Sequence, residues 1–226
     1  MAALETKLDK CLGSIDQATL AKSKNAPLNP KNSTKNAAAP ATKISFGPNK
    51  LSKVDILCQI SANSNPKMTL KTISQLLSAG KNVMVRQHIH SSIPIEKANS
   101  LSNEFSKLCL KNSIKINKEP GRAANEIDFI FTFLITNKLA KENKNVTDIS
   151  ATIHAAQFTS IFGDQNVAEL IFDLAGGKDV DEDDLYWVDM ISEALADASK
   201  LKNVKNIVDK NFENTGGFGD IAKMCL

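Results

Sequence analysis

The sequence has few aromatic residues, only two arginines and no long apolar run. Aromatic side chains make up 5% of the 226 residues, which argues against the stacking surface that many single-strand nucleic-acid binders use. The longest apolar stretch, residues 127–135, is interrupted by Asp128 and Thr132, whereas a membrane span needs about twenty apolar residues. We therefore expect a soluble protein without a membrane partner.

Paired cysteines and recognised metal or catalytic motifs are also lacking. The four cysteines lie far apart and form no C-x-x-C pair, a spacing that fits neither a zinc site nor a disulfide framework. His88 and His90 have no third ligand at a suitable spacing. A calcium loop counted from Asp179 would need glycine and glutamate where the chain has Asp184 and Met190. We expect reduced thiols in a cytosolic protein, no metal, no cofactor and no enzymatic activity.

What the sequence does have is a strong charge asymmetry. Residues 17–125 carry 17 lysines and arginines against 4 acidic residues, whereas residues 126–226 carry 9 against 18. Many basic groups favour salt-sensitive, sequence-independent binding to nucleic acid. Residues 23–48 are rich in Lys, Asn, Ala, Ser, Thr and Pro, which predicts a flexible basic linker. This linker is either a simple tether or an arm that lies near a polyanion.

The spacing of apolar residues predicts an all-α fold of about eight helices. Thr69 is expected to N-cap one helix and Pro94 to open the next. The segment Val83–Ile89 fits either a strand or a helix. The expected helices of the body follow one another at short intervals, over residues 51–60, 70–79, 95–112, 119–143, 149–162, 165–175, 185–202 and 203–212.

We expect three regions along the chain. Residues 1–50 form an N-terminal arm, made of a short amphipathic helix and the flexible linker; residues 51–213 form the all-α core; residues 214–226 form a mobile C-terminal tail. The helix of the arm would be marginal alone. Its apolar stripe is therefore expected to dock on a neighbouring molecule or to fold back on the body.

Arg122 is the strongest candidate for a functional side chain. It opens the densest apolar stretch of the chain, residues 119–140, and is expected in the first turn of a central helix, where unpaired amide groups favour an anion. A guanidinium can hold a phosphate with two parallel hydrogen bonds. Lys115 and Lys118 precede it in a basic loop. The alternative is an ordinary surface arginine.

This layout resembles the coat proteins of flexuous filamentous plant RNA viruses. The matching features are a flexible N-terminal arm, Arg122 in EPGRAANEIDFIF, Phe172–Asp173 in AELIFDLAGG, and the amphipathic stretch DLYWVDMISEALADAS. The resemblance implies that Arg122 lines an RNA groove, that Asp173 supports it, and that Ser91 or Ser92 contacts RNA. Nucleoproteins of segmented negative-strand viruses share this broad layout.

Together these features predict a capsid or nucleocapsid protein. It would bind single-stranded RNA without sequence preference, polymerise head to tail into a helical filament through its N-terminal arm, and be found in the virion and the host cell cytoplasm. The alternative is a cytosolic helical adaptor that binds proteins and not RNA. The predicted RNA-binding residues are Arg86, Ser91, Ser92, Lys115, Lys118, Arg122 and Asp173.

Overall fold

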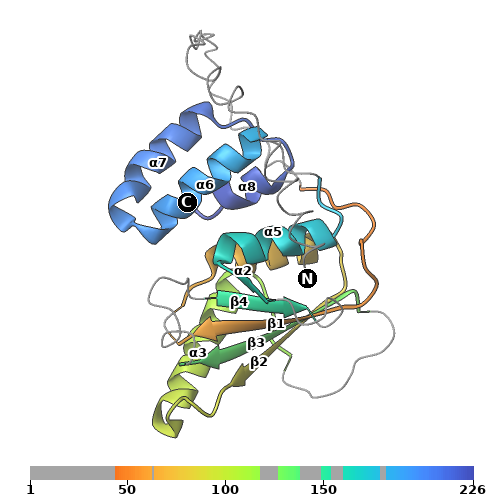
Figure 1. Ribbon diagram of the computed structural model, residues 1–226, viewed down its shortest axis with the longest axis vertical. Helices are drawn as coiled ribbons and strands as arrows, with labels where there is room; N and C mark the ends of the chain where they lie inside the picture. Colours follow the sequence, from red (N-terminus) through yellow and green to blue (C-terminus); the bar gives the residue numbers. More distant parts are fainter. Residues whose placement is uncertain (1–43, 63, 118–126, 138–148, 154–159, 179–181) are drawn as a thin grey trace, which may run out of the picture. The chain divides into compact units, whose positions relative to one another are not determined.

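The structure is a computed structural model that describes residues 44–62, 64–117, 127–137, 149–153, 160–178 and 182–226. The chain divides into two compact units, Met1–Ala39 and Pro40–Leu226. The first unit, which includes the expected N-terminal helix, lies outside the described residues. All the labelled elements in Figure 1 belong to the second unit.

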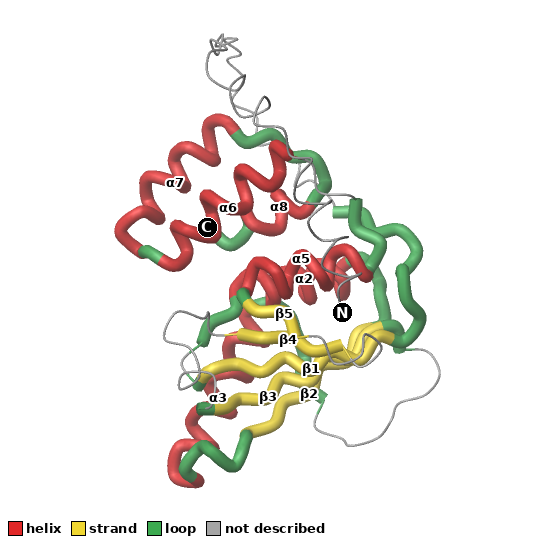
Figure 2. The backbone as a smooth tube through the Cα atoms, in the orientation of Figure 1, coloured by secondary structure: helices red, strands yellow, loops and turns green. Residues whose placement is uncertain are grey.

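The centre of the second unit is a five-stranded mixed sheet in the order β2-β3-β1-β4-β5 (Figure 2). Strands β1, β2 and β3 are parallel, whereas β4 is antiparallel to β1 and to β5. The prediction of an all-α fold is therefore wrong, because the chain is α/β. The strands are β1 (Val54–Ser61), β2 (Val83–Ile89), β3 (Phe129–Thr136), β4 (Ile149–Ile153) and β5 (Ser160–Phe162).

The densest apolar stretch is strand β3 and not the predicted central helix. Phe129, Phe131 and Phe133 are fully buried on one face of the sheet, while the residues between them are half-buried on the other. A strand inside a parallel sheet reads as a nearly continuous apolar run, which also resembles one side of a buried helix. Residues 119–126 and 138–143 of the predicted helix lie outside the described residues.

Two more predicted helices are strands. Residues 51–60 contain most of β1, which buries every second residue from Val54 to Ile60, the period-2 pattern of a strand. The described part of residues 149–162 forms β4 and β5. The ambiguous segment Val83–Ile89 is the edge strand β2.

Three helices cover one face of the sheet. They are α2 (Lys67–Ser78), α3 (Ile95–Lys111) and α5 (Asp164–Leu174), and they confirm the helices predicted over 70–79, 95–112 and 165–175. Each buries apolar side chains in the core that contains the phenylalanines of β3. Thr69 lies inside α2, whose N-cap residue is Pro66, so the predicted cap is wrong.

The two crossover connections between the parallel strands have opposite hands. The connection through α2 moves two positions along the sheet, from β1 to β2, and the one through α3 moves one position back, from β2 to β3. Both helices lie on the same face: the Phe105 ring of α3 packs 4.9 Å from the Phe133 ring, and α2 buries Leu70 and Ile73 in the same core. One of the two crossovers therefore departs from the usual right-handed rule.

A second core joins the C-terminal helices to α2 and α5. It is built by α6 (Glu182–Ala196), α7 (Ala198–Asn211) and α8 (Phe218–Lys223). The predicted helix over 185–202 is divided at Asp197, whose side chain accepts a hydrogen bond from the Ser199 N–H and begins α7. The prediction of a mobile C-terminal tail is wrong, because Phe218 and Ile221 of α8 are fully buried.

Residues 44–50 form a strap across the C-terminal end of α5. The Gly47 N–H donates to the Gly176 carbonyl at 2.8 Å, and the Lys50 N–H donates to the Leu174 carbonyl at 2.9 Å. The Lys81 ammonium donates to the Gly47 carbonyl at 2.6 Å. The strap, which falls within the predicted N-terminal arm, is therefore held against the body by ordered backbone hydrogen bonds.

Candidate functional site

Several exposed side chains lie on one side of α6, including Tyr186, the most exposed large hydrophobic side chain of the C-terminal helices. Leu185, Tyr186, Asp189 and Glu193 are all exposed, and Tyr186 is 62% exposed. Residues three, four and seven positions apart share one side of a helix, so Tyr186, Asp189 and Glu193 follow one another along the surface. Val188 and Ile191 point the other way, into the second core. The helix thus presents two apolar groups beside two carboxylates, of which Glu193 is paired with Lys200.

The Tyr186 ring packs against a second aromatic ring, which in turn packs against a third. Its ring lies 5.3 Å from Trp187 in an edge-to-face arrangement, and Trp187 lies 5.8 Å from Phe212 in the same way. The Lys223 ammonium lies 5.1 Å from the centre of the Phe212 ring. Such ring pairs contribute about 0.5–1.5 kcal/mol each beyond burial. The exposed Tyr186 ring is therefore held on an ordered base.

Helix α5 adds negative charge next to this face. Burial raises the pKa of Glu169, and the neighbouring carboxylates of Asp189 and Asp173 raise it further. The Gln165 side chain donates to Asp189 at 2.7 Å and joins the two helices. We call Leu185, Tyr186, Asp189 and Glu193 of α6, with Glu169 of α5, the acidic–aromatic surface.

Two of the predicted RNA-binding residues lie near each other at the β2 edge of the sheet. Arg86 lies on β2, and Ile116 forms a bridge to Val85 that places Lys115 beside the same strand. Lys115 is exposed and Arg86 is half-buried. Arg122 and Lys118, the centre of the predicted site, lie outside the described residues.

The remaining predicted residues are spread over the fold. Ser91 is exposed in the turn after β2. Ser92 beside it contacts the Thr136 hydroxyl at 3.3 Å and accepts from the Asn137 N–H at 3.2 Å, which joins the carboxyl ends of β2 and β3. Asp173 lies on α5 and pairs with Lys50 of the strap. Since α5 packs on the covered face of the sheet, the structure does not bring Asp173 to Arg86.

Of the described cysteines, Cys58 and Cys109 are buried and Cys225 is half-buried. Burial raises the pKa of the Cys58, Cys109 and Cys225 thiols to about 12, so they stay protonated at neutral pH. Within the described residues, no group of three or more His, Cys, Asp or Glu side chains is placed to hold a metal ion. In the same part of the chain, every helix is too short or too polar to cross a membrane.

No protein-family model matches the sequence, and no curated protein matches it either. The likeness to filamentous virus coat proteins therefore remains a resemblance of layout. The all-α fold that it implied is wrong, because the central segment that carries the likeness is strand β3.

The acidic–aromatic surface was not predicted from the sequence. The acidic run at residues 179–184 and the single tyrosine and tryptophan are visible there, but carboxylates at a helix start are explained by the helix dipole alone. The exposed side of α6 became clear only when α7 and α8 showed which side is buried. A sequence signal was present in Tyr186, since tyrosine and tryptophan are enriched in interface hot spots.

Proposed function

We propose that the protein is a protein-interaction module and that the acidic–aromatic surface binds a partner protein. The observation that carries this proposal is Tyr186, a large aromatic side chain that is 62% exposed and rests on the Trp187 ring. Tyrosines of this kind dominate binding energy where they enter a pocket of a partner. This function is that of the adaptor given above as the alternative to a capsid protein, except that the body of the protein is α/β and not helical.

The charge of the surface defines the chemistry of the partner. Burial is the largest cause of the raised pKa of Glu169, and repulsion from the carboxylates of Asp189 and Asp173 adds to it. Lysine or arginine side chains of a partner would relieve this repulsion and steer its approach. The partner is thus a protein that presents basic groups around an apolar pocket for Tyr186.

Photo-crosslinking from single positions tests this function. A benzoylphenylalanine in place of Tyr186 is expected to capture one defined protein in cells. The same group in place of Asn203, which is exposed on α7, is the control and is expected not to capture it. Equal capture at both positions, or capture at neither, would contradict the proposal.

RNA binding with head-to-tail polymerisation is the second candidate function. Its support is that Arg86 lies on the edge strand β2 with Lys115 in the segment beside it, within a part of the chain that carries 17 basic residues against 4 acidic ones. Such a protein would purify with a high 260/280 absorbance ratio and form particles that loosen at high salt. A protein that stays monomeric with RNA at low salt would rule it out.

A further inference from the structure

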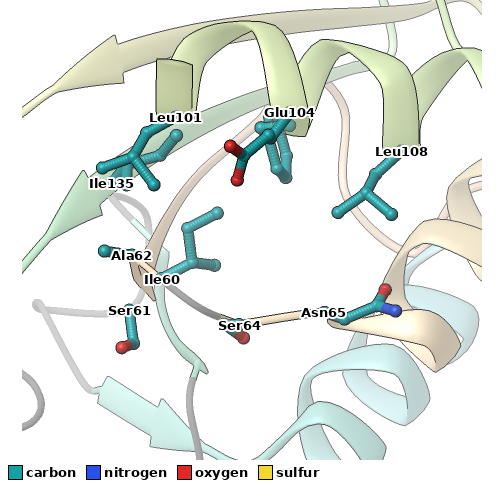
Figure 3. Close-up of a pocket in the computed structure, with 10 residues that line it drawn as sticks. Ile60, Ser61, Ala62, Ser64, Asn65, Leu101, Glu104, Leu108 and Ile135 are labelled. Atoms are coloured by element: carbon teal, nitrogen blue, oxygen red, sulfur yellow. The ribbon is translucent and has the colours of Figure 1, made fainter. Parts of the chain in front are cut away.

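A small cavity opens between α3 and the carboxyl ends of β1 and β3 (Figure 3). Its floor is apolar and consists of Ile60, Phe105 and Ile135, all nearly fully buried. Asn65 and Glu104 stand exposed at its rim. Ligands of α/β proteins characteristically bind outside the carboxyl ends of parallel strands.

Helix α3 builds the cavity because one of its faces is only partly filled. Leu101, Glu104 and Leu108 lie at helical spacing and face the end of β1 (Figure 3). Phe105 reaches the sheet and packs against Phe133 at 4.9 Å. The other three side chains line the space above the turn between β1 and α2.

The size of the cavity selects the class of ligand. Its volume is about 140 Å³, close to the roughly 150 Å³ of an engineered cavity that holds one benzene molecule. Pockets for cofactors and metabolites are usually about 300–1,000 Å³. The space therefore fits a single apolar side chain, such as leucine, better than a nucleotide or a cofactor.

The rim adds a preference for positive charge. Among the described residues that line the cavity, Glu104 is the only charged one. Its carboxylate accepts a hydrogen bond from the Ser100 hydroxyl at 2.9 Å and remains exposed. A carboxylate beside an apolar pocket favours a cation that flanks the inserted side chain. The amide of Asn65 also lies at the rim.

We propose that this cavity binds a leucine-like side chain of a partner protein segment, with a neighbouring lysine or arginine paired to Glu104. The inference rests on the proposed function in one respect, that the ligand is a protein. The binding site itself is separate from the acidic–aromatic surface. The α6 surface offers a projecting ring to its partner, whereas the cavity receives a side chain.

Methyl-group NMR of the full chain tests the inference with an acetylated and amidated Lys-Leu-Lys tripeptide as the probe. The peptide is expected to shift the methyl signals of Ile60, Leu101 and Ile135, while a Lys-Asn-Lys peptide is not. Ala62→Leu, which fills the cavity, is expected to weaken binding by about tenfold or more. Glu104→Gln, which keeps the shape, is expected to weaken it by about threefold.

Three results would overturn the inference: no shift with Lys-Leu-Lys, equal shifts with Lys-Asn-Lys, or shifts with toluene alone, which would mean that the cavity takes only a free apolar molecule. Unchanged signals of Ile191 in the second core serve as the folding control for Ala62→Leu. Tyr186→Ala is expected to leave the peptide response unchanged. A failure of peptide binding at the cavity can therefore be distinguished from a failure of partner binding at the α6 surface.

Discussion

Asp164 joins the N-terminal ends of two helices. It is the first residue of α5, yet its carboxylate accepts hydrogen bonds from the Met68 and Thr69 N–H groups of α2 at 2.8 and 2.9 Å. Helix α2 has no side-chain cap of its own, so Asp164 satisfies amide groups that the helix leaves open. One side chain thereby ties the layer of helices together across about a hundred residues of sequence.

We expect Asp164→Ala to lower the free energy of unfolding by about 1–2 kcal/mol, the usual effect of losing a helix cap. The two N–H groups of α2 would lose their partner in a half-buried place. Urea denaturation followed by circular dichroism measures the loss. Asp209→Ala on the exposed side of α7 is the control and should change little; equal losses for both variants would contradict this role.

The stabilising contribution of Asp164 should depend on pH. Burial raises the pKa of Asp164 above its ordinary value of 3.8, so the folded protein binds this proton more tightly than the unfolded chain. Its contribution is full below the ordinary pKa and is lost as the pH rises through the raised pKa. The difference in unfolding free energy between wild type and Asp164→Asn, measured from pH 3 to about pH 7, should fall over that window.

Asp197 provides a control of opposite sign. Hydrogen bonds from Ser199 lower the pKa of Asp197, so its contribution is present above its ordinary pKa and is lost as the pH falls. The wild-type minus Asp197→Asn difference should therefore shrink on acidification. A flat or rising difference for Asp164 as the pH increases would contradict the account of its burial.

At the scale of elements, the strap of residues 44–50 depends on a close backbone approach at Gly176. Gly176 has a φ of +74°, and a Cβ there would lie 2.2 Å from the Pro48 carbonyl oxygen. Gly80 has a φ of +81° and no atom within 4 Å of its Cβ position. The two glycines have nearly the same φ, but only Gly176 lies against the strap.

Comparing Gly176→Ala with Gly80→Ala therefore isolates the strap. Both variants should lose about 1–2 kcal/mol for a left-handed alanine, and Gly176→Ala should lose a further 1 kcal/mol or more, about the cost of a broken hydrogen bond and a clash. Chemical denaturation gives the two losses, and hydrogen exchange at the Gly47 and Lys50 amides reports release of the strap. Equal losses with unchanged exchange would contradict the strap contact.

The amphipathic helices were predictable, whereas the strands were not. Helices α2, α3 and α5 carry a clear apolar stripe with Pro or Gly at their ends, and their sequences alone indicate them. In β1 and β3 some apolar residues lie on each face of the strand, so the alternation of apolar and polar residues that marks a strand is obscured. Their identity depends on pairing between Ile56 and Phe131 across about 75 residues, which local spacing does not encode.

At the scale of the whole molecule, three phenylalanine rings link the strap, the helical layer and the C-terminal helices. Phe172 of α5 lies 5.3 Å from Phe46 of the strap and 5.5 Å from Phe218 of α8. Phe172 is almost completely buried. It belongs to the second core, while Val167 and Ile171 on the same helix belong to the first. Helix α5 therefore couples the two cores, as α2 does through Met68.

Phe172→Ala should cost about 3–5 kcal/mol, the usual range for truncating a buried phenylalanine. It should also uncouple the cores, so that Trp187 fluorescence and far-ultraviolet circular dichroism report separate urea transitions, where the wild type gives coincident ones. Phe162→Ala on β5, where the ring is 47% exposed, is the matched control and should keep them coincident. Coincident transitions in Phe172→Ala would contradict the coupling.

The candidate site could be predicted only in its composition. The sequence shows acidic residues and the single tyrosine and tryptophan close together, but which side of α6 is exposed depends on contacts with α7 and α8. The predicted basic site is split between two places: Arg86 lies on the edge strand β2 with Lys115 in the segment beside it, while Asp173 pairs with Lys50 on the other side of the sheet. Which of these distant residues lie close together is decided by the topology of the sheet and not by their spacing in the sequence.

The central claim is that Tyr186 anchors a partner protein, and a titration of the crosslinked partner against purified variants tests it most directly. Tyr186→Ala should weaken binding by about tenfold to a hundredfold, as for a hot-spot residue, without changing the circular dichroism spectrum. Leu110→Ala on α3, where the side chain is 68% exposed, should leave the affinity unchanged. Equal affinities for wild type, Tyr186→Ala and Leu110→Ala would contradict the claim.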